Sequence, residues 1–92
     1  DSSLEQDTVD KMKAVIAKVE GVRNLHMLRT RRMGGYALAD VHIQVDPRLS
    51  VSEGHQISEV VRYSLINTVK ELDDITVHID PEDDEDAPIC AG

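Results

Sequence analysis

The sequence predicts an α+β domain in which two helices cover one face of a three-stranded mixed sheet. Apolar residues recur every three or four positions in two segments, as on a helix, and every second position in the segments that follow each of them. With 92 residues, the chain has the length of one small domain with a single thin core. We therefore expect the order helix, strand, strand, helix, strand.

The first helix is predicted over residues 4–20. Lysines separate its apolar positions, which lie three or four residues apart. These apolar positions are Val9, Met12, Ile16 and Val19. Ser2 and Glu5 have the spacing of a capping box at the start of this helix. Gly21 lies where a helix C-terminus favours a residue with a left-handed backbone.

Two strands are predicted next, at about 23–33 and up to Asp46, and Gly34-Gly35 joins them as an antiparallel hairpin. The second strand alternates between an apolar face (Ala37, Ala39, Val41, Ile43, Val45) and a mostly polar face (Leu38, Asp40, His42, Gln44, Asp46). Such alternation is typical of a strand with one buried and one solvated side. It places His42 on the solvated side.

The second helix begins at another capping box, formed by Ser50 and Glu53. Its predicted core stripe consists of Ile57, Val60, Val61, Ser64, Leu65 and Thr68. At about 100° per residue, His55 lies roughly opposite this stripe. We therefore expect His55 to point away from the core of its own domain.

The third strand is predicted from Ile75 to Asp80, with alternate residues facing the core (Ile75, Val77, Ile79) and solvent (Thr76, His78, Asp80). A strand, helix and strand in succession form a right-handed crossover, so this strand should run parallel to the second one. The expected fold is an open ferredoxin-like sandwich that lacks a first strand. Its uncovered sheet face carries histidines.

Charge divides the chain into two parts. The formal net charge is −8, and six of the 18 acidic residues lie between positions 80 and 86. We predict a folded domain at 1–81 and an acidic, disordered tail at 82–92. The negative charge and the presence of only two aromatic residues, both tyrosines, argue against nucleic acid as a partner.

The single cysteine, Cys90, cannot form an intramolecular disulfide, which favours a reducing compartment. No apolar segment reaches the roughly 20 residues of a membrane span.

Three side chains suggest a metal site. His42 lies on the central strand, and His78 and Asp80 lie on its parallel neighbour, on the same side of the sheet. Neighbouring strands are about 4.8 Å apart, so these side chains can converge on one or two divalent ions. Nitrogen and oxygen donors suit zinc, and also iron, manganese, cobalt, nickel or cadmium.

The position of His26 depends on the register of the hairpin. If Gly34-Gly35 is a plain two-residue turn, His26 pairs with Ile43 and is buried. If the loop has an odd number of residues or the strand has a bulge, His26 pairs with His42 on the solvated face. We favour this shifted register, which buries Leu25 and Met27 and exposes Leu28.

Several features have ordinary explanations. His55 taken alone and the acidic run are typical of solvated surface, and Cys90 of an inert side chain. No nucleophile with an adjacent base, phosphate-binding loop or paired-cysteine motif is present, so we do not expect an enzyme.

Four segments in this order resemble the cytoplasmic C-terminal domain of cation diffusion facilitator transporters, most of all the bacterial iron and zinc efflux type. The resemblance covers roughly 4–81 and rests on G-V-x-x-x-H-x-L-R-T-R (21–31), A-D-V-H-I-Q-V-D (39–46), G-H (54–55) and H-x-D-P (78–81). It implies the metallochaperone-like form of the predicted fold. It also implies that the chain is one domain of a longer membrane protein.

By position, the resemblance implies that His26, His42, His78 and Asp80 are metal ligands and that His55 reaches a site in a partner subunit. It implies a homodimer on the cytoplasmic face of the bacterial inner membrane. Divalent metal, zinc first, would close this dimer and promote proton-coupled efflux by the protein's own transmembrane domain. Two alternatives remain open: a free-standing metallochaperone or metal buffer of the same fold, and a small regulatory module that binds an organic ligand.

Overall fold

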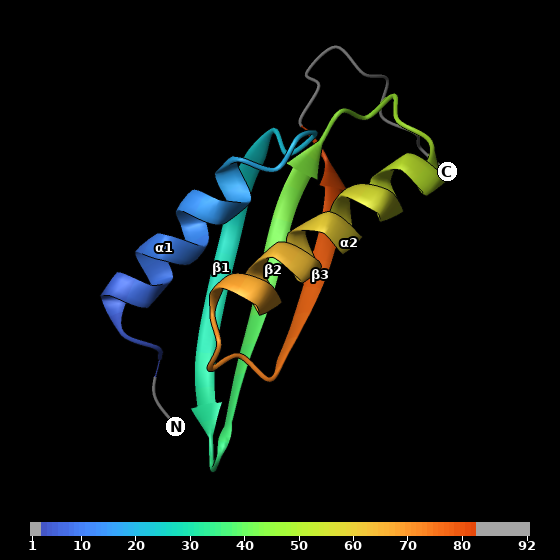
Figure 1. Ribbon diagram of the computed structural model, residues 1–92. Coiled ribbons are helices and arrows are strands. Elements are labelled where there is room, and N and C mark those ends of the chain that lie inside the picture. Colours follow the sequence, from blue (N-terminus) through green and yellow to red (C-terminus); the bar gives the residue numbers. More distant parts are fainter. Residues whose placement is uncertain (1–2, 83–92) are drawn as a thin grey trace, which may run out of the picture.

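The computed structural model describes residues 3–82 and confirms the predicted order and fold class. The elements are α1 (Gln6–Ala17), β1 (Asn24–Met33), β2 (Tyr36–Val45), α2 (Val51–Thr68) and β3 (Asp74–Pro81). Figure 1 shows both helices on the same side of the sheet, so the opposite side is covered by neither. No helix in the described part of the chain is both long and apolar enough to cross a membrane.

The sheet has the strand order β1-β2-β3, with β1 and β2 antiparallel and β2 and β3 parallel. Met33 pairs with Tyr36 across the Gly34-Gly35 turn, so the turn is a plain two-residue connection. His42 pairs with His78 in the parallel ladder. β2 is thus the central strand, as the sequence predicts.

The core lies between the sheet and the two helices. All five residues of the predicted apolar face of β2 are buried, together with residues from both helices such as Met12, Ile16, Val61 and Leu65. On β3, Ile75 is buried, and Val77 and Ile79 are half-buried against the same core. The strict alternation of the central strand therefore gives one dry face and one wet face.

The start of α1 differs from the prediction. The helix begins at Gln6, and Glu5 is its N-cap without a side-chain hydrogen bond, so the predicted capping box is wrong. Leu4 is buried, and its backbone N–H donates to Thr30 Oγ1 at 3.1 Å. This attachment to β1 holds the preceding chain in an extended path, which delays the first helical turn. Ser2 lies outside the described residues.

The other end of α1 is as expected in one respect. The helix ends at Ala17, and the chain turns through Gly21, whose φ is +99°. A Cβ atom at this glycine would lie 2.5 Å from Ile57 Cδ1 of α2. Glycine is required here both by the backbone conformation and by the close approach of α2.

The capping box of α2 is confirmed. Ser50 Oγ accepts from the Glu53 N–H at 3.0 Å, and Glu53 Oε1 accepts from the Ser50 N–H at 2.8 Å. These two hydrogen bonds hold the pKa of the Glu53 carboxyl below its ordinary value.

The core stripe of α2 is shifted from the predicted one. Ser58 is buried instead of Val60, which is 43% exposed. The Ser58 hydroxyl donates to the His55 carbonyl at 2.6 Å, so the helix itself satisfies this polar group and allows its burial.

Candidate metal centre

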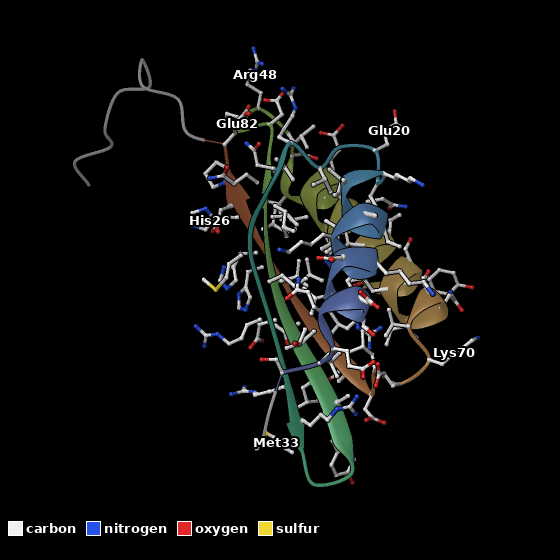
Figure 2. All side chains as sticks on the ribbon, turned by 90° about the vertical axis from the view of Figure 1, so that its left-hand side faces the viewer. Glu20, His26, Met33, Arg48, Lys70 and Glu82 are labelled. Atoms are coloured by element: carbon white, nitrogen blue, oxygen red, sulfur yellow. The ribbon has the colours of Figure 1, made fainter. Side chains whose placement is uncertain are left out.

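A β-bulge in β1 sets the position of His26. Leu25 pairs with Ile43 and Met27 pairs with His42, so His26 is the extra residue between them. A bulge, one of the two ways in which the favoured shift could arise, is therefore present. The predicted pairing of His26 with His42 is wrong, however, because the ladder partner of His42 is Met27 and His26 is the extra residue beside that pair. Figure 2 shows His26 on the side of the sheet that faces away from the helices.

The effect of the bulge on its neighbours differs from the prediction in two residues. Leu25 and Leu28 are both half-buried and pack against the core, whereas Met27 is 37% exposed. A single shifted register along the whole strand would bury Met27 and expose Leu28, as predicted from the sequence. The hairpin turn is regular, and the register changes only on the N-terminal side of Met27. Both leucines therefore reach the core.

His42 and His78 lie next to each other on the uncovered face. Their rings stack with centroids 4.3 Å apart and an interplanar angle of 13°. This contact follows directly from the parallel ladder, in which the two residues are register partners. Because the two rings are nearly parallel and stacked face to face, their in-plane nitrogen lone pairs do not converge on one point between them.

Asp80 lies two residues farther along β3 than His78. Its Oδ2 atom is 3.8 Å from His42 Nδ1, beyond hydrogen-bond distance but close enough for an electrostatic attraction. The side chain of His42 is 28% exposed and that of Asp80 is 54% exposed. The cluster is therefore open to solvent and can exchange small ions.

An ionic network fixes the strand ends beside this cluster. Arg23 lies 3.2 Å from Asp46 Oδ2 and 3.6 Å from Glu82 Oε1, and so links the start of β1 to the ends of β2 and β3. The hydrogen bonds and the charges of Arg48 and Arg23 hold the pKa of the Asp46 carboxyl below its ordinary value, those from Arg48 most strongly. The network therefore joins the ends of the three strands beside the cluster.

The chemistry of the donors fits a divalent transition metal, whereas their arrangement in one chain is incomplete. Two imidazoles and one carboxylate are suitable ligands for zinc and similar ions. Within residues 3–82, however, no three or more His, Cys, Asp or Glu side chains are grouped closely enough to hold a metal ion. A complete coordination sphere requires rotation of these exposed side chains or donors from another molecule.

His55 does not join the other candidates. It lies in the first turns of α2, is exposed as predicted, and belongs to the helical layer on the other side of the sheet. Glu82, the first residue of the predicted tail, donates its N–H to the Val45 carbonyl at 2.7 Å. The remainder of that tail, with Cys90, lies outside the described residues, so its disorder stays a prediction.

Met27 is a neighbour of His42 that was not predicted from the sequence. The available signal was the spacing of Leu25 and Leu28, two large apolar residues three positions apart in a strand. Both can face the core only if an extra residue lies between them.

Comparison with known proteins identifies close relatives of this domain. The family model described as "Cation efflux protein, cytoplasmic domain" matches residues 4–82. The chain is 38% identical over 81 residues to Metal tolerance protein C1 of Arabidopsis thaliana, covering 88% of this chain and 17% of that protein. It is 32% identical over 81 residues to the Cation-efflux pump FieF of Pectobacterium carotovorum, covering 88% of this chain and 27% of that protein. The chain therefore spans well under a third of either relative.

Solved structures have the same fold. A manganese form of a MamM CTD variant matches with a TM-score of 0.78 and 27% identity, covering 84% of this chain and 98% of that one. A nickel form of another MamM CTD variant matches with a TM-score of 0.81 and 25% identity, covering 86% of this chain and all of that one. These matches confirm the open α-β-β-α-β architecture.

Proposed function

This chain belongs to the family of cytoplasmic domains of cation efflux proteins, and on that premise we propose that it is a regulatory metal-sensing and dimerisation domain of a proton-coupled efflux transporter. The family is one of transporter domains and not of enzymes. The observation that carries the proposal is the cluster of His42, His78 and Asp80 on the sheet face that no helix covers.

The three side chains have distinct roles in this proposal. His42 and His78 provide imidazole nitrogens from adjacent strands, and Asp80 provides carboxylate oxygens from the same edge of the cluster. A bound divalent cation supplies positive charge that neutralises the carboxylate and links the strands. We place His26 nearby as a further donor, because it is the bulge residue next to Met27, the ladder partner of His42.

The incompleteness of the cluster supports a role for a second copy of the chain. A structural zinc site usually has four protein ligands, whereas within residues 3–82 no three His, Cys, Asp or Glu side chains are grouped closely enough to hold an ion. Donors from a partner complete the site, so metal binds the associated state more tightly than the separate one. A ligand with such a difference in affinity shifts the equilibrium towards the closed dimer. His55, which faces away from its own core, is our candidate for a cross-subunit contact.

The lengths of the relatives support a larger protein. Since the chain spans 17–27% of the relatives described above, we infer that a transmembrane part accounts for much of the rest. We place the domain on the cytoplasmic face of a membrane, the inner membrane in a bacterium, where it senses the metal to be exported. Zinc is our first choice of metal, and the manganese and nickel forms of MamM CTD support a broader divalent range.

Zinc titration by calorimetry, combined with small-angle scattering, tests this proposal. The double variant His42→Ala, Asp80→Ala should lose tight zinc uptake and zinc-dependent closure, while its melting temperature stays unchanged because both residues lie on the solvated face. The matched control is the double variant Asp40→Ala, Thr76→Ala. These two residues are register partners on the same face of the same two strands, two positions before His42 and His78.

The outcomes are decisive. The control should bind zinc like the unsubstituted chain. An unchanged zinc stoichiometry in the His42 and Asp80 variant would overturn the site. Tight zinc binding without any change in scattering would overturn the coupling to dimer closure.

A further inference from the structure

We propose that His26, Met27 and His42 form a second site, selective for a soft monovalent ion such as Cu(I) or Ag(I). This proposal goes beyond the divalent site and shares with it the side chains of His42 and His26. It rests on the bulge in β1, which places a thioether and an imidazole side by side opposite a second imidazole.

The burial pattern locates both residues of the bulge on the uncovered face. Leu25 and Leu28 pack against the core on either side of them. His26 and Met27 lie between these leucines and are both exposed, so both side chains face solvent on the side of His42. A regular strand would place only one of the two on this face.

The register brings the donors within reach of one ion. Met27 is the direct partner of His42 in the antiparallel ladder. The Cβ atoms of such partners are about 4.5–5.5 Å apart, and a methionine side chain is long and flexible enough to bring its sulfur to an ion bound by the opposite imidazole. His26 is adjacent in sequence and adds a third donor.

The type of donor determines the preferred ion. A thioether is a soft ligand that favours Cu(I), whereas carboxylate oxygen favours harder divalent ions. The two kinds of donor lie on opposite sides of His42, with Met27 on the β1 side and Asp80 on the β3 side, 3.8 Å from the ring. His42 is therefore the shared ligand of a soft half and a hard half of the same surface. Binding of Cu(I) and of zinc should be competitive.

Met33 provides an internal control. It lies on the same strand and the same face, is 51% exposed, and pairs with Tyr36 instead of a histidine. Figure 2 shows Met33 at the hairpin end, far along the strand from His26. Any effect specific to Met27 therefore reflects its neighbours and not the presence of a thioether on this face.

The test is a Cu(I) titration under anaerobic conditions against the chromophoric chelator bicinchoninate, carried out in a Cys90→Ser background because Cys90 is the only thiol. Met27→Leu keeps the apolar volume and should weaken Cu(I) binding by about tenfold or more, in the range expected for the loss of a group that supports a metal. Met33→Leu should bind Cu(I) like the background protein. Zinc affinity should be unaffected by either change.

A second measurement does not depend on a substitution at either methionine. In the background protein, addition of silver nitrate without chloride should shift the NMR signal of the Met27 methyl group and leave that of Met33 in place. Equal Cu(I) affinities of Met27→Leu and Met33→Leu, or equal shifts of both methyl signals, would overturn the soft site.

The outcome for zinc separates the two proposals. Retained zinc binding together with a Cu(I) affinity that does not depend on Met27 removes only the soft site. Absent zinc binding together with Cu(I) binding that depends on Met27 removes only the divalent site. Zinc that fails to compete with Cu(I) would show that His42 is not shared, which also contradicts the proposal as stated.

Discussion

The two faces of the sheet follow different physical rules. The helix-covered face consists of buried apolar residues at strictly alternating positions of β2, and its composition is set by packing. The uncovered face carries donor side chains, a stacked imidazole pair and the bulge that breaks the alternation of β1. Stability thus depends mainly on one face and binding on the other, and substitutions on the two faces should have separable effects.

The largest expected effect is a loss of stability on the covered face. Ile43 is fully buried, and Ile43→Ala should lower the free energy of unfolding by about 2–5 kcal/mol, because it removes buried methyl groups and leaves a cavity. Gln44 is the next residue on the same strand, faces the other side, and accepts a hydrogen bond from Asn24. Gln44→Ala should change the free energy by about 0.5 kcal/mol.

Urea unfolding of both variants measures this contrast. Zinc binding per folded molecule should be unchanged in Ile43→Ala, since the donors do not contact the cavity side of the sheet. Equal destabilisation by the two substitutions would contradict the division between the faces.

The covered face is also the part that could be predicted from the sequence. The alternation of Ala37 to Val45 gives β2 its orientation, and the crossover rule then fixes β3 beside it. Periodicity could not give the start of α1, because the contact of Leu4 with Thr30 is a tertiary interaction. It also misplaced Val60, since a buried serine satisfied within α2 is indistinguishable by pattern from a solvated one.

The uncovered face could be predicted only in part. His42, His78 and Asp80 follow from alternation, and the structure places them together. The location of the bulge was not determined, because a shift at the turn and a shift within β1 give the same position for His26. Only the burial of both Leu25 and Leu28 distinguishes them.

A smaller effect on stability should distinguish two glycines with positive φ. A Cβ atom added at Gly34 (φ +63°) would have no other atom within 4 Å. Gly34→Ala should therefore cost only about 1 kcal/mol of backbone strain. Gly21 (φ +99°) lies against the Ile57 side chain of α2. Gly21→Ala should therefore cost about 1–3 kcal/mol more than Gly34→Ala, because the new methyl group overlaps Ile57.

Thermal unfolding of the two alanine variants measures the difference. Adding Ile57→Val to Gly21→Ala removes the Cδ1 atom and should recover part of the loss, although Ile57→Val alone is destabilising. Equal costs at the two glycines would show that the helical layer adjusts to the extra methyl group without strain.

The smallest expected effect on stability concerns the bulge itself. Deleting His26 leaves Leu25 opposite Ile43 and Met27 opposite His42, which are the partners that these residues already have. The strand then alternates regularly, with both leucines still facing the core. The free energy of unfolding should therefore change by less than about 1 kcal/mol.

Cu(I) affinity should fall in the variant that lacks His26, because one donor is lost. His26→Ala keeps the extra residue and removes only the imidazole. Its Cu(I) affinity should match that of the deletion if the His26 imidazole binds the ion.

A deletion that unfolds the chain while His26→Ala remains folded would show that the bulge is required by the fold. If both variants fold and only the deletion loses Cu(I) binding, the bulge acts by orienting Met27. The retained stability that we expect would instead mean that the extra residue in β1 serves binding on the uncovered face.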